Sequence, residues 1–292
     1  MTKDKMSSRE LGLILGQQLL GVEDLHYGLW DDDLALNFSN LPIAQQRYTD
    51  MIASVLPDPK GSEIHILDVG CGTGHILSQL SAKGYAVDGV IPSRFLGSMV
   101  KERIADMPSS NSKVFELKFE DFPDQIYKQF YDVVLFSESF QYIKMRDSFP
   151  KIEKILKPGG LVVICDFFKT EHVGDGQPGD KTFGGGHQLN EFYKRVEESP
   201  FAILRDDDIT RNVSPNIELL DKFLMNQLRP AGETLSRYMA ENKPMLAKIG
   251  NFFFKKKMDK LNHKYFSGHR SKEVFERYKS YHLVVLQLVK PV

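Results

Sequence analysis

The feature that most constrains this chain is a glycine-rich turn between a short apolar strand and a helix. The strand is predicted over Ile64–Val69, the turn is Gly70-Cys71-Gly72-Thr73-Gly74, and a helical pattern begins at His75. Glycine at alternate positions removes every Cβ that would keep a ligand away from the backbone. The free N–H groups of the turn and of the helix start can then bind a polar or negatively charged group. The sequence therefore predicts a ligand site where this strand ends.

Short β-branched runs alternate with helical patterns along most of the chain, which is typical of a sheet built from βαβ units. Leu161–Phe167 is apolar nearly throughout, as expected for a strand covered on both faces. The predicted strands are Ile64–Val69, Ala86–Ile91, Val114–Leu117, Asp132–Phe136, Leu161–Phe167, Phe201–Asp208 and Tyr281–Lys290. The predicted helices between the first five strands are His75–Lys83, Arg94–Asp106 and Arg146–Leu156.

Four parts of the chain follow from this pattern. Residues 1–63 are predicted to form a helical lid segment that includes an amphipathic helix over Leu11–Leu20. Residues 64–215 form the α/β core, residues 216–278 a helical cap over the substrate site, and residues 279–292 the last strand of the core. Residues 170–187 carry a run of glycines, which predicts a long loop over the working edge of the sheet.

Composition argues against several classes of protein. The 292 residues include 38 Lys and Arg against 39 Asp and Glu, for a formal net charge of -1, whereas a nucleic-acid binder needs a basic surplus. No stretch reaches the roughly 18 apolar residues of a membrane span, and no signal-peptide cleavage site follows Leu20. Cys71 and Cys165 cannot make a disulfide framework. We therefore expect a cytoplasmic monomer or homodimer that binds neither nucleic acid nor, stably, a membrane.

Three motifs occur in the order and spacing of class I S-adenosylmethionine (SAM)-dependent methyltransferases. Leu67–Gly74 resembles the first motif of that family, Phe130–Ile143 its fourth-strand motif and Lys154–Phe167 its fifth-strand motif. The third glycine comes one residue too early for a dinucleotide fingerprint, which disfavours a nicotinamide oxidoreductase. The resemblance implies an α/β, Rossmann-like fold with a seven-stranded, mostly parallel sheet in the order 3-2-1-4-5-7-6. Helices cover both faces, and the helical cap is inserted before the last strand.

The resemblance also implies SAM as the cofactor and S-adenosylhomocysteine (SAH) as its product, bound across the carboxyl ends of the first four strands. The implied cofactor-binding residues in the core are Asp68, Gly70, Cys71, Gly72, Gly74, Ile91, Phe119, Glu120, Asp121 and Ser137. Ile91 stands where most members of the family carry an acid for the ribose hydroxyls. Strand alternation directs the nearby Asp88 to the opposite face. Lys118 likewise departs from the acid often found near the adenine.

Leu25–Trp30 (LHYGLW) resembles a motif of methyltransferases that act on natural products, lipids and small amines. This resemblance implies that Tyr27 and Trp30 wall the methyl donor, where an aromatic face attracts a sulfonium. The alternative is that the two rings, three residues apart, simply pack on the domain. Asp31–Asp33 is interpreted as a solvated cluster, and no metal site is expected.

Methyl transfer from a sulfonium is an in-line displacement, for which alignment and desolvation supply much of the acceleration. A hydroxyl or carbon acceptor also needs a base. The candidate catalytic residues are His187, His26 and Glu138. For each we also consider a structural role: a helix start for His187, the shape of the lid for His26 and a loop hydrogen bond for Glu138. The candidate substrate-binding residues are Gln141, Tyr142 and Phe223.

Phe252–Lys257, three phenylalanines followed by three lysines, is interpreted as a buried aromatic face beside a solvated one rather than as a membrane contact. As a whole, the sequence predicts a SAM-dependent methyltransferase that transfers a methyl group to oxygen, carbon or nitrogen of a small, hydrophobic metabolite. The departures at Ile91 and Lys118 keep one alternative open. It is a SAM-binding protein of the same fold with a cyclase-like or regulatory role.

Overall fold

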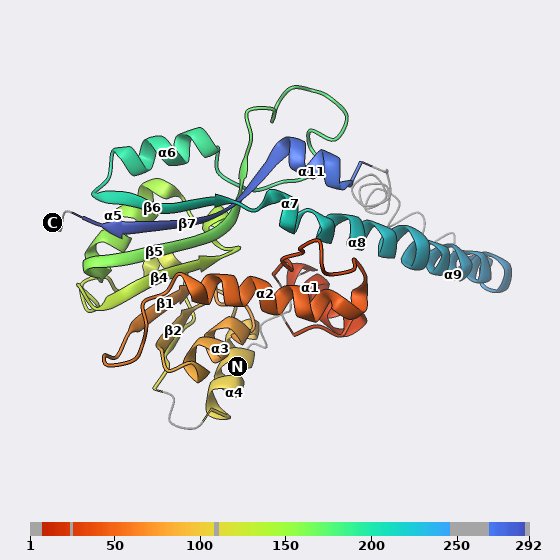
Figure 1. Ribbon diagram of the computed structural model, residues 1–292. Coiled ribbons are helices and arrows are strands. Elements are labelled where there is room, and N and C mark those ends of the chain that lie inside the picture. The colour runs from red at the N-terminus through yellow and green to blue at the C-terminus, as the bar shows by residue number, and fades with distance from the viewer. Residues whose placement is uncertain (1–7, 24–25, 108–110, 246–268, 290–292) are drawn as a thin grey trace.

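A seven-stranded sheet forms the centre of the computed structural model, which describes residues 8–23, 26–107, 111–245 and 269–289 (Figure 1). Its strand order, β3-β2-β1-β4-β5-β7-β6, is the predicted one. The strands are β1 (His65–Val69), β2 (Ala86–Val90), β3 (Val114–Phe115), β4 (Tyr131–Ser137), β5 (Leu156–Lys169), β6 (Phe201–Asp208) and β7 (Lys279–Leu288).

Helices precede the sheet, connect its strands and form the insertion before β7. The α-helices are α1 (Ser8–Leu20), α2 (Leu41–Ser54), α3 (His75–Ala82), α4 (Arg94–Ala105), α5 (Met145–Ile155), α6 (Leu189–Glu197), α7 (Thr210–Val213), α8 (Pro215–Phe223), α9 (Arg229–Asn242) and α11 (Lys272–Tyr278). The short turns are η1 (Phe38–Asn40), η2 (Phe119–Asp121), η3 (Phe140–Tyr142) and the π-helical η4 (Leu224–Leu228).

The direction of the strands determines where a ligand site can form. β1 pairs in parallel with β2 and β4, β2 with β3, and β4 with β5, whereas β7 runs antiparallel to both β5 and β6. The carboxyl ends of β1 to β5 therefore meet at one edge, where open α/β sheets bind their ligands. The mostly parallel α/β fold expected from the sequence is thus confirmed.

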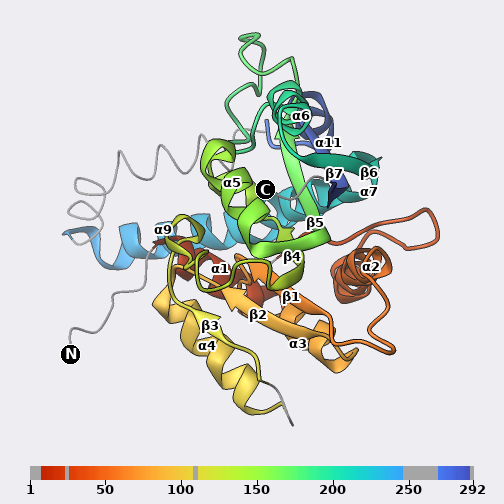
Figure 2. The ribbon, with the colours of Figure 1, turned by 90° about the vertical axis from the view of Figure 1, so that its left-hand side faces the viewer.

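The two faces of the sheet carry separate hydrophobic cores. On β4, Val133 and Leu135 pack with residues of α2, α3 and α4, whereas Val134 and Phe136 pack with residues of α5 and α6 on the other face. Figure 2 shows these two helical layers on opposite sides of the strands. Successive strand residues point to opposite faces, and here both faces are covered. This explains why the sequences of these strands are nearly continuous apolar runs.

The fifth strand starts earlier than the sequence predicts. Leu156 already pairs with Tyr131, and the pairing resumes at Leu161 after a register shift. The intervening Lys157–Gly160 contains Gly159 at φ = 77°, a conformation that glycine adopts without strain. The Pro-Gly-Gly sequence therefore bends the strand as well as ending the preceding helix.

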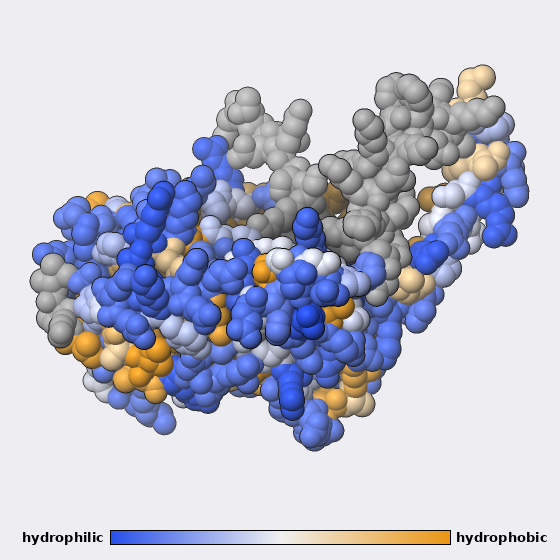
Figure 3. Space-filling view, turned by 90° about the horizontal axis from the view of Figure 1, so that it is seen from above, coloured by the Kyte–Doolittle hydropathy of each residue, from blue (hydrophilic) through white to orange (hydrophobic). Residues whose placement is uncertain are grey.

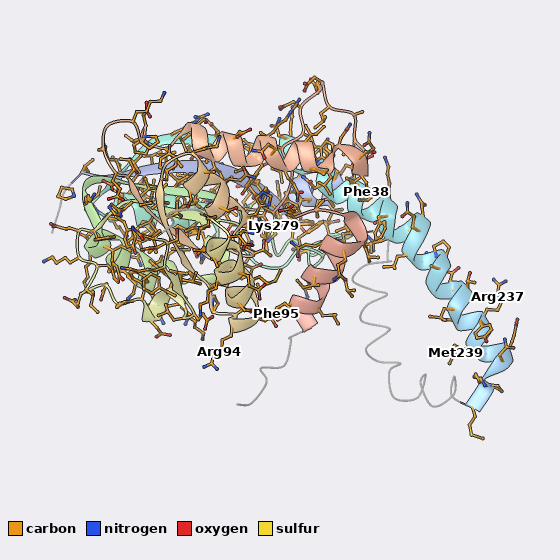
Figure 4. The ribbon with its side chains drawn as sticks, turned by 90° about the horizontal axis from the view of Figure 1, so that it is seen from below. Phe38, Arg94, Phe95, Arg237, Met239 and Lys279 are labelled. Atoms are coloured by element: carbon orange, nitrogen blue, oxygen red, sulfur yellow. The ribbon has the colours of Figure 1, made fainter. Side chains whose placement is uncertain are left out.

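The insertion between β6 and β7 begins in the core at α8 and returns to it at α11, whereas α9 lies outside the core. Ile217 on α8 is completely buried, whereas α9 has no buried residue. α9 extends away from the sheet as an arm that carries Arg237 and Met239, and its surface is mostly hydrophilic (Figures 3 and 4). Phe252–Lys257 lies outside the described residues, and the role of residues 216–278 as a substrate cap stays a prediction.

Asn216, the second residue of α8, fixes the N-terminal segment to the insertion. Its Oδ1 accepts hydrogen bonds from the Gly28 N–H (2.9 Å) and the Trp30 indole N–H (3.0 Å), and its Nδ2 donates to the carbonyls of Gly28 and Val213 (both 2.6 Å). Gly28 packs so tightly that a Cβ would lie 2.6 Å from that of Ala44. The segment before α2 is therefore part of the core, not an appendage.

We expect Asn216→Ala to lower the free energy of unfolding by about 2–4 kcal/mol, because it leaves the N–H groups of Gly28 and Trp30 buried without an acceptor. Urea unfolding measures this loss. Asn242→Ala, which removes an exposed amide on α9, is the matched control and should be nearly neutral. Equal losses in the two variants would contradict the anchoring role of Asn216.

Candidate active site

A cavity of about 520 Å³ opens at the carboxyl edge of the sheet, within the range of roughly 300–1,000 Å³ that is common for small-molecule sites. Its walls come from the glycine turn, the end of β2, η2 and the segment after β4. Glu10 of α1 adds a wall from the N-terminal helix. The predicted site residues that line it are His26, Asp68, Gly70, Cys71, Gly72, Ile91, Phe119, Glu120, Ser137, Glu138 and Tyr142.

The three glycines of the turn have different roles. Gly70 has φ = 82°, and a Cβ there would lie 2.4 Å from that of Ser139. Gly74, which does not line the cavity, precedes α3, and a Cβ there would lie 2.9 Å from a methyl group of Val100. At Gly72, with φ = 57°, a Cβ would meet open space. Packing therefore requires glycine at 70 and 74, whereas Gly72 leaves room for a ligand.

Asp68, at the end of β1, faces the cavity with only 2% of its surface exposed. Among the described residues, no donor makes a hydrogen bond to its carboxyl group. Burial raises its pKa to about 7, although the nearby His26 acts in the opposite direction. A cationic ligand group beside Asp68 would compensate the cost of burying its charge.

Ile91 at the end of β2 and Phe119 of η2 give the cavity two apolar surfaces. Ile91 and Phe119 are 6% and 2% exposed. Asp88 belongs to the opposite face, where its carboxylate accepts hydrogen bonds from the Lys113 N–H and the Tyr131 hydroxyl (both 2.8 Å). Asp121 is exposed on η2 and does not line the cavity, in contrast to its neighbour Glu120.

Glu138, directly after β4, is held in an unusual conformation. Its φ of 53° is in the left-handed region, which costs energy for a residue with a Cβ. Its Oε1 accepts hydrogen bonds from the Tyr27 N–H (2.8 Å) and the Tyr281 hydroxyl (2.9 Å). Burial raises the pKa of the Glu138 carboxyl, and His26 and these two donors act against that rise. Strain of this kind clusters at functional sites.

Two buried tyrosines connect Glu138 to α2. The hydroxyl of Tyr281, which donates to Glu138, lies 2.9 Å from the hydroxyl of Tyr48. Tyr48 also lies within 3.2 Å of the Cys165 carbonyl oxygen and the Ser137 hydroxyl. Burial raises the pKa of both phenols well above the usual value, so they remain neutral donors.

His26 lies on the same side of the cavity. Its ring stacks on Tyr48, with ring centres 4.4 Å apart and planes at 20°. Nδ1 lies 2.8 Å from the Tyr27 carbonyl oxygen, which can only accept, so Nδ1 carries a proton. Nε2 lies 3.4 Å from the Thr49 hydroxyl.

The structure places Tyr27 and Trp30 outside the set of residues that line the cavity, and their role as walls for the methyl donor stays a prediction. Trp30 packs among apolar residues of α2 and α8, because its indole N–H finds its acceptor in Asn216. The Tyr27 ring packs at an edge-to-face angle on Phe275 and Tyr281. Packing, the alternative considered for this motif, describes both rings.

Three further candidates also lie outside the cavity. The ring nitrogen Nε2 of His187 donates to the carbonyls of Phe140 and Ile143 (3.1 and 2.9 Å), so His187 supports η3 and is not placed to act as a base. Gln141 donates through its N–H and its Nε2 to Asp166 (both 3.0 Å). Phe223 packs on Phe38, which Figure 4 labels, with ring centres 5.6 Å apart.

Several cavity residues were missed by sequence reasoning: Glu10, Thr73, His75, Ser93, Lys118, Ser139 and Ile143. Ser93, which caps α4, and Ser139, which follows Glu138, could have been found from their positions beside predicted motifs. Glu10 could not, because it lies on a helix remote in sequence. Within the described ranges, no three His, Cys, Asp or Glu side chains cluster as metal ligands, and no helix is long and apolar enough to cross a membrane.

Comparisons with known proteins agree with this geometry. A family model described as a methyltransferase domain matches residues 43–193, just over half of the chain. O-methyltransferase resE of Aspergillus sclerotiorum is 25% identical over 248 residues, which are 78% of this chain and 87% of the relative. The 27-O-demethylrifamycin SV methyltransferase of Amycolatopsis mediterranei is 31% identical over 153 residues, 51% of this chain and 53% of the relative.

A solved structure shares the fold over nearly the whole chain. The geranyl diphosphate C-methyltransferase from Streptomyces coelicolor, in complex with Mg²⁺, geranyl diphosphate and SAH, has a TM-score of 0.66 at 16% identity. The match covers 94% of this chain and 92% of that one.

The fold, the glycine turn and the family match define a SAM-dependent methyltransferase of class I. The chain belongs to the methyltransferase family. The comparisons give no support to a non-methylating role.

The pKa of Asp68 makes the stability of the ligand-free protein depend on pH. The folded-state pKa of about 7 exceeds the ordinary value of 3.8, so the folded protein binds the extra proton between these values. The contribution of Asp68 to the free energy of unfolding is complete below about pH 4, and it is lost as the pH rises through 7. Asp166, whose pKa is raised to about 8, acts in the same direction.

We expect Asp68→Asn to make the fall of unfolding free energy between pH 5 and 8 shallower, as measured by urea unfolding at several pH values. The exposed Asp32→Asn variant is the control and should follow the unmodified protein. Parallel curves for Asp68→Asn and the unmodified protein would show that Asp68 is ionised throughout.

Proposed function

We propose that this protein transfers the methyl group of SAM to a hydroxyl oxygen of a small, hydrophobic acceptor, and that Glu138 removes the proton of that hydroxyl. The observation that carries this proposal is the half-buried Glu138 carboxylate at the cavity wall, in a strained backbone conformation and held by two donors. A hydroxyl group needs a base to become a strong nucleophile. A carboxylate with a raised pKa at the carboxyl edge suits that role.

The residues of the cavity fit SAM. Asp68 offers an unshared carboxylate to the ammonium group of the methionine part, the open backbone at Gly72 admits the ligand, and Phe119 and Ile91 offer apolar surfaces to the adenine ring. SAM, when bound, supplies an electrophilic methyl group. The remaining chemistry is positioning, exclusion of water and removal of one proton.

Glu138 is well held for proton removal. Both of its hydrogen bonds go to Oε1, so among the described residues Oε2 has no donor. In the proposal, Oε2 of Glu138 takes up the hydroxyl proton of the acceptor molecule, while the hydroxyl oxygen receives the methyl group of SAM. Tyr281 keeps the carboxylate in place, and Tyr48 orients Tyr281.

Residues that follow Glu138 support a hydrophobic acceptor. Tyr142 and Ile143 line the cavity and offer apolar surface beside the Glu138 carboxylate. The relatives with names that specify an oxygen acceptor, resE and the rifamycin enzyme, support an oxygen as the methylated atom. The net charge of -1 favours a small molecule over nucleic acid, and the two buried, free cysteines suit the cytoplasm.

We expect Glu138→Gln to lower kcat about 10²- to 10⁴-fold, because the amide still accepts hydrogen bonds at its oxygen but is not a base. The affinity for SAM should stay within about threefold, since the proposal gives Glu138 no contact with the cofactor. SAH formation over a panel of phenols and aliphatic alcohols first identifies an acceptor and then measures the rate.

Glu153→Gln on α5, outside the cavity, is the matched control and should leave the rate unchanged. An active Glu138→Gln enzyme would remove Glu138 as the base. A methylated amine or carbon product in place of an ether would overturn the oxygen acceptor.

We expect Gly72→Arg to abolish SAM binding in calorimetry, because its side chain would extend into the space that the proposal gives to the cofactor. Gly159→Arg is the control. It has a similar positive φ (77° against 57°) and open surroundings, but it lies between the two paired parts of β5, away from the cavity. If both variants bound SAM like the unmodified protein, the cofactor would bind elsewhere.

A further inference from the structure

The end of β2 has no acid of its own, yet a carboxylate lies beside it. Glu10 of α1 lines the cavity, and its Oε1 accepts a hydrogen bond from the hydroxyl of Ser93. Ser93 follows Ile91 by two residues and caps α4, where Figure 4 labels the next residues, Arg94 and Phe95. A residue distant in sequence thus brings a negative charge to the apolar end of β2.

The orientation of α1 supports a polar task for Glu10. Glu10, Ile14 and Gln17 are half-buried on one side of the helix, whereas Leu11, Leu15 and Leu19 are 48%, 44% and 60% exposed on the other. Glu10 thus lies on the side of α1 that faces the cavity. An arrangement that turns a glutamate toward a cavity requires a compensating polar interaction there.

The other carboxylates near the cavity lie at other strands. Among the described residues that line it, the acids besides Glu10 are Asp68, Glu120 and Glu138. Asp68 ends β1, Glu120 belongs to η2 after β3, and Glu138 follows β4. Asp88 of β2 is occupied on the opposite face by Lys113 and Tyr131. Glu10 is therefore the carboxylate placed beside the end of β2.

We propose that Glu10 binds the ribose diol of the cofactor from α1, in a role that Ile91 cannot perform. The inference rests on the proposed cofactor site. A vicinal diol presents two O–H donors and an ionised carboxylate presents two acceptor oxygens, so the pair can form two charge-assisted hydrogen bonds. The Ile91 side chain has no acceptor, and its N–H is bonded to the Phe115 carbonyl oxygen (3.0 Å).

The segment after α1 is tied down on the same side. The Glu23 carboxylate lies 3.2 Å from Arg103 of α4 and 3.4 Å from His75 at the start of α3. The Glu23 carbonyl oxygen accepts a hydrogen bond from the Gln17 amide (2.6 Å). α1 is therefore fixed at Glu10 and near its end, and a diol bound to Glu10 would hold the helix over the cavity.

The test compares SAH with its 2′,3′-dideoxy analogue by calorimetry. The unmodified protein should bind SAH about 10- to 100-fold more tightly than the analogue, which is the usual effect of hydrogen bonds to a charged group. In Glu10→Gln this preference should fall to about threefold or less, mainly through weaker binding of SAH. Glu102→Gln, an exposed acid on α4 outside the cavity, should keep the full preference.

A merely structural role of Glu10 would weaken SAH and the analogue equally, and that result would overturn the proposal while the cofactor site remained. A full preference in Glu10→Gln, or no preference in the unmodified protein, would overturn it as well. Failure of the unmodified protein to bind SAH at all would instead overturn the cofactor site. Circular dichroism and thermal unfolding of each variant separate these outcomes from loss of the fold.

Discussion

The carboxylate of Glu138 is the point at which the separate parts of this protein meet. Its hydrogen bonds come from Tyr27 in the N-terminal segment and from Tyr281 in the last strand, and Tyr48 of α2 supports Tyr281. Burying a carboxylate is costly unless donors surround it, so the site is stable only when these segments are all in place. The strained φ of Glu138 can persist for the same reason, because the surrounding contacts hold the residue in that conformation.

The sheet and its cofactor edge could be predicted because their causes are local. The apolar strands and the glycine turn each carry a pattern that sheet geometry imposes, and Asp68, Gly72 and Phe119 line the cavity as expected from their places after strands. The roles of Trp30 and His187 could not be predicted in the same way. Each has a buried polar hydrogen whose acceptor, Asn216 for one and two η3-region carbonyls for the other, is distant in sequence. An aromatic or imidazole side chain in a motif does not reveal which partner satisfies it.

The N-terminal helix shows a second limit of sequence patterns. The segment Leu11–Leu20 predicts an amphipathic helix, and the structure exposes Leu11, Leu15 and Leu19 on one side of it. Periodicity identifies the faces of a helix and not the surface against which it packs. A hydrogen bond from the Ser93 hydroxyl to Glu10 lies on the inward side, and only the fold brings these two residues together.

The two inferences about Glu138 and Glu10 assign different energetic roles to the two ends of the cavity. Glu138 is held by the protein before any ligand binds, because both of its donors belong to the chain, so it can act on a proton without reorganisation. Glu10 is on a surface helix, and on our proposal its diol contact would form only with bound cofactor. Binding of the cofactor would then hold α1 across the cavity and exclude water when the reacting groups are in place. Because the carboxylate that binds the ribose would lie on α1 and not at the end of β2, recognition of the cofactor would be coupled to closure of the site.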